Sequence, residues 1–156
     1  MQKRFLELVT AFLAEANIEC PVVPGELIVT VPLGDFTFNI GLFESRNAIV
    51  MQGAAGVVPA SGREAFYAEL LRMNSLFKGT GGASFGLEGD AVTIQSIICM
   101  EDLSQEAFNS QAVTFLEALA SALEGFEAIG ERAASGASET EVSDLDLLAM
   151  QNMLRI

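Results

Sequence analysis

The apolar residues at the start of the chain recur at the spacing of an amphipathic helix. They stand at i, i+3, i+4, i+7, i+8 and i+11: Phe5, Leu8, Val9, Phe12, Leu13 and Ala16. The charged residues Lys3, Glu7 and Glu15 lie elsewhere on the helical wheel. This pattern predicts a first helix whose apolar stripe packs on a sheet, with exposure of part of the stripe to a partner as the alternative.

From residue 26 to residue 53 the pattern changes to strict alternation. Apolar side chains share one face of each of two consecutive segments: Leu27, Val29, Val31 and Leu33, then Phe36, Phe38, Ile40 and Leu42. Gly34 and Asp35 supply the turn between the segments, a second turn follows at 44–47, and residues 48–52 return as a third strand. The alternation predicts an antiparallel meander with one buried face.

The middle of the chain combines a helix, a glycine-rich bend and a hairpin. Ser61 and Glu64 have the spacing of a capping box, and apolar residues at helical spacing continue to about 74–77. The glycines of 79–82 then end the helix. Residues 84–100 alternate around a Gly-Asp turn and are rich in β-branched side chains, which predicts a β-hairpin.

A long third helix is predicted after the hairpin. Asp102 or Ser104 can cap it, and it ends near Arg132. Its broad apolar stripe contains Phe108, Ala112, Phe115, Leu116, Leu119, Leu123 and Phe126. We therefore expect one α+β domain over residues 1–132, with the order α-β-β-β-α-β-β-α and helices that cover a twisted antiparallel sheet.

The remainder of the chain has a different composition. Residues 133–142 are mostly small and polar, which predicts a flexible linker. In residues 143–156 a short capping box precedes a short amphipathic helix, and one helical face collects the apolar side chains Leu145, Leu148, Ala149, Met153 and Ile156. This segment cannot join the core of the domain without folding back.

The charge of the chain is strongly one-sided. Twenty-one Asp and Glu against eight Lys and Arg give a net charge of −13, with no Lys or Arg between Gly79 and Glu131. Nucleic acids and anionic membrane surfaces are bound by cationic side chains, so we expect neither as a partner. The hydrophobic content is nevertheless 51%. A high net charge keeps such an apolar chain in solution, which suits a protein that binds partners with exposed apolar surface.

Little in the sequence predicts catalysis. There is no histidine, so the commonest general base and metal ligand is missing, and we expect no catalytic residue, no metal site and no cofactor. The glycine cluster 79–82 follows a helix and precedes a strand, which reverses the order of a phosphate loop, so it predicts a tight bend instead. The adjacent acids Glu101 and Asp102 are typical of a helix cap. We predict that the protein is not an enzyme.

The expected location is the cytoplasm. Cys20 and Cys99 are far apart and have no CxxC spacing, which is typical of free thiols in a reducing compartment. Glu7 and Glu15 interrupt the region that a signal peptide would need apolar, and no apolar run approaches the length of a membrane span.

The residues of 70–87 resemble a family motif. The run LLRMNSLF at 70–77 is followed by GTGGASFGL at 79–87. This stretch resembles the central motif of the class I type III secretion chaperones, the Tir-chaperone-like family. In that motif a helix that ends in Asn and Leu leads through a turn of small residues into a strand of the Gly-Leu kind. The order of elements over residues 3–132 agrees with the same family.

The resemblance implies a homodimer and a function. The interface would involve the second helix and the strand after it, at Leu70, Leu71, Phe77, Phe85 and Leu87. The function would be to bind the N-terminal segment of a secreted effector in the cytoplasm, extended, unfolded and export-competent, without ATP. Apolar grooves and a sheet edge that accepts an added strand would hold the segment. We predict contacts from the first helix and the meander, at Val9, Phe12, Leu13, Val29, Val31, Phe38, Ile40 and Leu42.

Two alternatives stay open at this point. The chain could be a small α+β regulatory or sensory domain that binds a protein or a small molecule in signalling, because one architecture supports many functions. The segment after Arg132 lies outside the resemblance, and its apolar face could dock on its own dimer, on a second protein such as the export ATPase, or on nothing. We rank docking on its own dimer first, because tethering gives a high effective concentration.

Overall fold

The computed structural model describes residues 1–75 and 80–135. Its elements are α1 (Gln2–Glu15), β1 (Ile28–Leu33), β2 (Phe36–Phe43), the 3-10 turn η1 (Glu44–Arg46), β3 (Ala48–Val57), α2 (Arg63–Asn74), β4 (Ser84–Glu88), β5 (Ala91–Cys99) and α3 (Gln105–Ser135). The five strands form one sheet in the order β1-β2-β3-β5-β4, and all neighbours are antiparallel. The predicted α+β class and the predicted order of helices and strands are confirmed.

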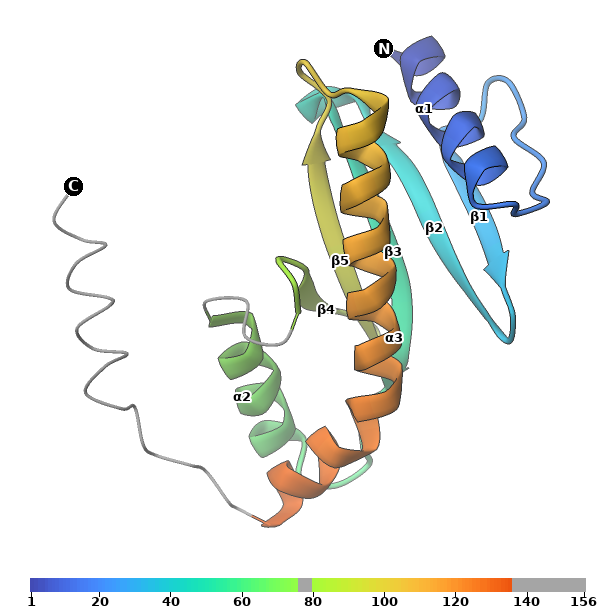
Figure 1. Ribbon diagram of the computed structural model, residues 1–156. Helices are drawn as coiled ribbons and strands as arrows, with labels where there is room; N and C mark the ends of the chain where they lie inside the picture. The colour runs from blue at the N-terminus through green and yellow to red at the C-terminus, as the bar shows by residue number, and fades with distance from the viewer. Residues whose placement is uncertain (76–79, 136–156) are drawn as a thin grey trace, which may run out of the picture.

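The helices cover one face of the sheet. In Figure 1, α3 runs along β3 and β5, with α1 beside its N-terminal half and α2 beside its C-terminal half. α1 also contacts β2, and α2 contacts β4, so the two shorter helices lie at opposite ends of the strand order. Among the described residues no helix lies on the other face.

Two glycines of β3 allow α3 to approach the sheet closely. A Cβ atom at Gly53 would lie 2.7 Å from Leu119 Cδ2, and one at Gly56 would lie 2.3 Å from Phe126 Cε1. A shift of register between Ala54 and Gly56 turns Gly56 to the same face as Gly53. The line of α3 across the sheet therefore depends on the absence of side chains at these two positions.

One hydrophobic core runs the length of the sheet. Its largest fully buried side chains include Phe5, Phe38, Phe66, Phe108 and Phe115. Aromatic pairs join the elements at both ends: Phe12 of α1 packs on Phe108 of α3 with ring centroids 5.8 Å apart, and Phe66 of α2 packs on Phe126 of α3 at 5.6 Å. The apolar stripes predicted for the first and third helices face this core.

The start of α2 differs from the prediction. The helix begins at Arg63, and the N-cap position is taken by Gly62, which has a φ of 68° and makes no side-chain hydrogen bond. The capping box predicted from Ser61 and Glu64 is therefore wrong. Glycine adopts this left-handed conformation without the steric penalty of a Cβ atom, so the chain enters the helix there instead.

The start of α3 agrees with one of the two predicted caps. The N–H of Ala107 donates to Ser104 Oγ at 3.1 Å, so Ser104 is the cap, whereas Asp102 occupies a turn with a φ of 52°. The helix continues to Ser135, beyond the predicted end near Arg132. The C-terminal helix predicted at 143–156, and the parts of the predicted bend and linker that fall on 76–79 and 136–142, lie outside the described residues.

Candidate protein-binding surfaces

The residues predicted to contact a partner are all buried. They lie on α1, β1 and β2 and belong to the core: Val9, Phe12, Leu13, Val29, Val31, Phe38, Ile40 and Leu42. The helices of the same chain cover the face of the sheet to which the predicted strand residues point. A partner could reach these side chains only if α1 left the sheet, so the exposed apolar surface of the chain lies elsewhere.

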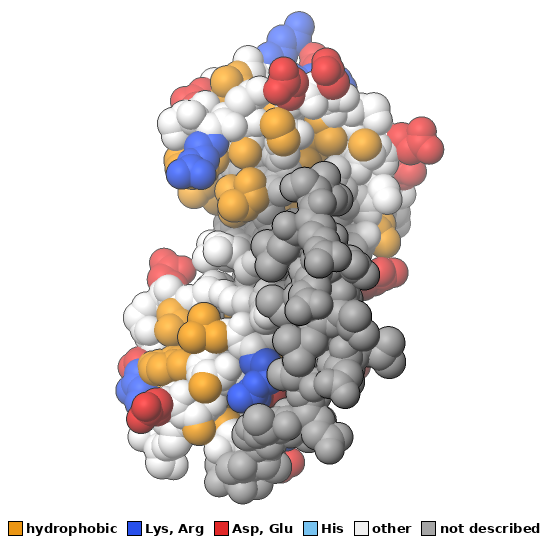
Figure 2. Space-filling model, turned by 90° about the vertical axis from the view of Figure 1, so that its left-hand side faces the viewer, with side chains coloured by type: hydrophobic (Ala, Val, Ile, Leu, Met, Phe, Trp, Pro, Cys, Tyr) orange, Lys and Arg blue, Asp and Glu red, His pale blue; other side chains and the backbone are white. Residues whose placement is uncertain are grey.

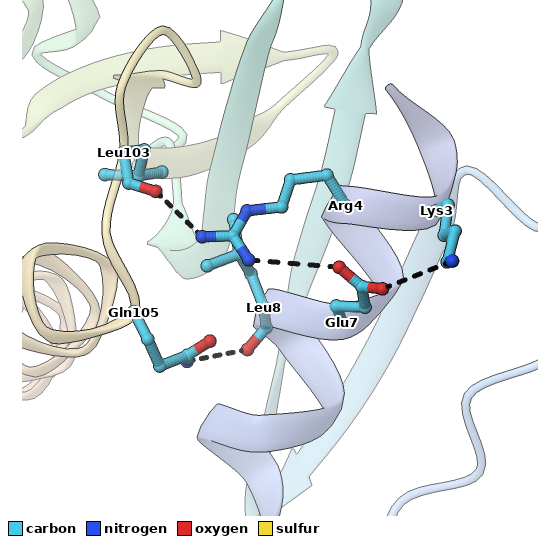
Figure 3. Close-up of polar contacts among 6 residues, drawn as sticks. All are labelled: Lys3, Arg4, Glu7, Leu8, Leu103 and Gln105. Carbon is cyan, nitrogen blue, oxygen red and sulfur yellow. Dashed lines mark hydrogen bonds and ion pairs between the residues drawn. The ribbon is translucent and has the colours of Figure 1, made fainter.

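Hydrogen bonds fasten α1 to the start of α3. Figure 3 shows Arg4 reaching from α1 to the backbone oxygen of Leu103 (3.1 Å), and Gln105 donating to the backbone oxygen of Leu8 (3.0 Å). Glu7 lies 3.8 Å from Arg4 and orients its guanidinium group. Each such bond contributes about 0.5–1.5 kcal/mol, so the network supplements the buried aromatic contacts that hold α1 in place.

The face of the sheet that points away from the helices, here called the open face, has an apolar band at one end. The strand register places Ile28, Gly41, Val50 and Ile97 in one row across β1, β2, β3 and β5. Ile28 is 60% exposed and Ile97 is 63% exposed, and the exposed ring of Phe43 lies at the same end of the sheet. Monomeric proteins rarely leave such neighbouring apolar side chains uncovered. The band is a candidate surface for a protein partner.

The open face carries little charge: among the strands, only the end of β4 brings a charged residue, Glu88, to this face. On β1, β2, β3 and β5, each of which the structure describes in full, no residue of this face is Asp, Glu, Lys or Arg. The row next to the band is polar and neutral: Thr30, Asn39, Gln52 and Gln95. Because the chain carries a net charge of −13, the lack of charge on these four strands is unexpected on composition alone. Depletion of charged residues is typical of the core of a protein interface.

The sequence contained a signal for this surface. Apolar residues stand next to one another at 27–29, 48–51 and 97–98, where strict alternation would place a polar residue between them. One residue of each adjacent pair must face away from the helices. Ile28, Val50 and Ile97 are these residues, and none of them is among the contacts predicted from the sequence.

The edge of the sheet at β1 is partly closed to an added strand. Cys20 Sγ donates to the backbone oxygen of Thr30 at 3.3 Å, and Pro32 has no N–H to offer. Both features reduce the capacity of β1 to pair with another chain. Cys20 and Cys99 are free thiols, in agreement with the sequence analysis.

A second apolar surface lies at the opposite edge of the sheet. A cavity of about 250 Å³ opens there and is called the α2–β4 hollow; it is lined by Tyr67, Leu70, Leu71, Asn74, Phe85, Gly86 and Leu87. Leu71 is 69% exposed and Leu87 is 51% exposed, whereas Leu70 and Phe85 are buried. Figure 2 views the molecule from this side and shows apolar side chains gathered in the lower half, where α2 lies, and again in the upper half.

The α2–β4 hollow coincides with the dimer interface predicted from the sequence. Leu70, Leu71, Phe85 and Leu87 are brought together there, and Phe77 lies outside the described residues. The contact of these residues with a second copy stays a prediction. The structure does identify the local surface that such a contact would use.

Asn74, the last residue of α2, holds β4 in place. Its Nδ2 donates to the backbone oxygen of Phe85 at 3.0 Å, and the N–H of Phe85 donates to Asn74 Oδ1 at 2.7 Å. The amide group thus satisfies the outer edge of β4 at Phe85 as a neighbouring strand would. Since outward-facing residues alternate in an antiparallel strand, Leu87 is the next position whose backbone faces outward. The asparagine of the motif therefore positions the edge strand.

Arg63 stabilises the tyrosine beside the α2–β4 hollow. Its guanidinium group donates to Tyr67 Oη at 3.1 and 3.3 Å and pairs with Asp90 on the β4–β5 turn. The hydrogen bond to Tyr67, followed by that to Asp90, raises the pKa of Arg63 above its ordinary value. These contacts hold the charged Arg63 guanidinium group against Tyr67 and Asp90.

The described residues offer little for other kinds of site. Within 1–75 and 80–135, no three His, Cys, Asp or Glu side chains are grouped so as to hold a metal ion. None of the helices in these ranges combines the length and the apolar character needed to cross a membrane.

Solved structures with the same fold support a comparison. A chain in the crystal structure of the ExsC–ExsE complex has a TM-score of 0.65 and 12% identity, covering 80% of this chain and 94% of that one. A chain of the HopA1–SchA chaperone–effector complex has a TM-score of 0.59 and 16% identity, covering 77% and 94%. YbjN from E. coli, described as a candidate transcription regulator, has a TM-score of 0.57 and 16% identity, covering 78% and 91%. At these identities the likeness shows a shared fold.

At the level of sequence, no curated protein matches this chain. The family model of the Tir chaperone protein (CesT) family matches residues 7–123, a range that begins within α1 and includes the whole sheet, α2 and the first part of α3. The match includes the motif at 70–87, and the resemblance inferred from the sequence is confirmed. The chain belongs to the Tir chaperone protein (CesT) family.

Proposed function

We propose that this protein is a type III secretion chaperone that binds the N-terminal segment of a secreted effector on its open face, in the cytoplasm and without ATP. The observation that carries the proposal is the partly apolar open face, free of charge on β1, β2, β3 and β5, in a member of a chaperone family. The family description is that of a chaperone and not of an enzyme. The complex of HopA1 with SchA has the same fold and is named a chaperone–effector complex.

The open face can bind an extended segment by simple burial. Ile28, Val50 and Ile97 form a row that aliphatic side chains of a client would cover, and each fully buried aliphatic side chain contributes about 1.5–3 kcal/mol. The neutral polar row beside it can bond to the backbone of the segment without selecting a charge. Association costs part of this energy, so the net affinity is lower than the sum of these contacts, and we propose that the client dissociates without a nucleotide.

We also propose that two copies associate through the α2–β4 hollow. Leu71 and Leu87 are exposed beside buried Leu70 and Phe85, so a second copy would complete the burial of a cluster that one chain covers only in part. A two-fold axis through this surface would place the same residues opposite one another. The dimer would present two copies of the open face.

The proposed function is tested by capture of a client from the cytosol of the native host with a tagged chain. Ile97→Asp introduces a charge into the apolar band, and Val113→Asp is the matched control, because Val113 is an exposed apolar residue (49%) on α3 outside the band. We expect a larger protein to co-purify with the wild type and with Val113→Asp but not with Ile97→Asp. Limited proteolysis of the complex should leave a protected fragment from near the N-terminus of the client.

A client that binds Ile97→Asp as well as the wild type would exclude the open face as its binding surface. A client that is folded and protected throughout would contradict the chaperone assignment.

The similarity to YbjN favours one other candidate, a regulatory domain. The low content of Lys and Arg argues against direct contact with DNA, so a regulator of this kind would act through a protein partner. The same capture experiment separates the two functions. A regulator is expected to yield a folded signalling protein whose proteolytic protection is not confined to one end.

A further inference from the structure

The α2–β4 hollow has a candidate occupant within the same chain. Past Ser135 the sequence continues through residues 136–156, and its pattern predicts a capping box and an apolar helical face at 143–156. We propose that this C-terminal segment seats its apolar face in the α2–β4 hollow of its own chain and competes with the second copy for that surface. The inference adds regulation to the proposed dimer and so rests, in its second half, on the proposed function.

The C-terminal end of α3 lies close to the hollow. Its last turns lie beside α2, and Arg132 Nε is 3.5 Å from Glu69 Oε1, next to Leu70 of the hollow. An α2 of 12 residues is about 18 Å long. The segment 136–142 spans up to about 23 Å when extended, so residue 143 can reach any part of the hollow.

The apolar face predicted for residues 143–156 and the α2–β4 hollow are chemically similar. The segment 143–156 is expected to present leucine, methionine and isoleucine side chains on one helical face. The hollow exposes two leucines, Leu71 and Leu87, above a buried apolar base. The sequence of the segment begins with two acids, Asp144 and Asp146, while Arg72 of α2 and Arg132 of α3 lie near the hollow, where both pair with Glu69.

The connection is also short. Only residues 136–142 separate the end of α3 from the segment, so the segment would have an effective concentration on the order of millimolar at the hollow, well above that of a second copy in a cell. At low protein concentration the tethered segment therefore occupies the hollow first. Self-association then requires its displacement.

The hollow contains its own reporter. Tyr67 lines it, and Tyr67 is the only tyrosine of a chain that has no tryptophan. Intrinsic fluorescence therefore reports on this surface alone. Acrylamide, a neutral quencher, measures how accessible the ring is without a bias from the charge of the protein.

The experiment uses the full chain with paired substitutions in the segment. Leu145→Ser with Leu148→Ser removes apolar side chains from the predicted docking face, and Leu147→Ser with Leu154→Ser removes the same chemistry from the opposite face. At a concentration where the chain sediments as a monomer, the first pair should raise the quenching constant of Tyr67 by roughly twofold, because the ring loses its apolar cover. The second pair should leave it at the wild-type value.

Self-association gives the second readout. With the first pair the dissociation constant of the dimer, measured by sedimentation, should fall by on the order of tenfold, because the competitor is weakened. In a background of Leu71→Ser, which alters the hollow itself, the first pair should have a much smaller effect on quenching.

Equal effects of both pairs, or no effect of either, would overturn the proposal. Quenching that changes with protein concentration but not with the segment would show that a second copy is the occupant and would overturn it as well. The tyrosine measurement needs neither client nor dimer. Its failure is therefore distinguishable from a failure of the proposed chaperone function, which is read from client capture.

Discussion

The two ends of the sheet use apolar residues differently. At the α1 end, every residue predicted to contact a partner is buried, and hydrogen bonds from Arg4 and Gln105 close the helix against α3. At the α2 end, Leu70 and Phe85 are buried, whereas Leu71 and Leu87 remain exposed around the hollow. Helices and sheet close the core completely at the α1 end and leave it partly uncovered at the α2 end. The incomplete end is therefore the one that needs another segment or another chain.

The difference between the two ends of the sheet is tested most strongly by truncating one aliphatic side chain to alanine at each end. Ile40→Ala should lower the free energy of unfolding by about 2–5 kcal/mol, because it leaves a cavity in a fully buried site. Leu71→Ala should change the free energy of unfolding of the monomer by less than about 0.5 kcal/mol, because the side chain is exposed. Urea unfolding at low protein concentration measures both. Similar losses at the two sites would mean that the α2 end is as closed as the α1 end.

Leu71→Asp should act on association and not on the monomer. A charge in the centre of the proposed dimer contact should raise the dissociation constant by at least about tenfold, since each 1.4 kcal/mol changes it by that factor. Sedimentation equilibrium gives the constant, and the unfolding midpoint of the monomer serves as the control. Val113→Asp places the same charge on an exposed apolar site of α3 and should leave association unchanged.

Asn74→Ala should loosen the edge strand. The backbone N–H and C=O of Phe85 both lose their partner, so we expect a loss of about 1–3 kcal/mol in the free energy of unfolding. Hydrogen exchange should show faster exchange of the Phe85 amide, with little change in β2. Unchanged protection of that amide would mean that the edge of β4 does not depend on the asparagine.

Gln105→Ala is expected to have the smallest effect. It removes a hydrogen bond to the backbone oxygen of Leu8, for which we expect about 0.5–1.5 kcal/mol of destabilisation. The buried contact of Phe12 with Phe108 still holds α1. Thermal unfolding monitored by circular dichroism measures the loss. An effect as large as that of Ile40→Ala would mean that the polar network, and not the core, holds α1 to α3.

Local patterns predicted the elements well and their caps less well. The helical spacing of Phe5 to Leu13 and the alternation from Val29 to Leu42 were read correctly, because both periods follow directly from backbone geometry. The capping box at Ser61 and Glu64 was not, because Gly62 can adopt a left-handed conformation that moves the start of α2. The sequence allows the helix to be capped at Ser61 or at Gly62. The packing of the whole chain decides between the two positions, and a local motif carries no information about that packing.

The candidate site was harder to predict than the fold. The alternation identified Ile40 and its neighbours as apolar and on one face, and we then assigned that face to a partner. It faces α1 and α3 instead. The exposed residues Ile28 and Ile97 lie one position away from buried strand residues, on the opposite side of the same strands. A sequence pattern separates two faces of a sheet, but it does not say which face the helices will cover.

The order of elements, the apolar stripes, the negative charge and the family motif are all written in the sequence, because each depends on residues that are near one another along the chain. Three features were decided only in three dimensions: the burial of the meander beneath α1 and α3, the apolar band on the open face, and the hollow between α2 and β4. Each depends on residues from elements that are distant in sequence. The physical reason is that the exposure of a residue depends on how the whole chain packs. The surface available for binding is the surface that remains exposed after the helices have packed on one face of the sheet.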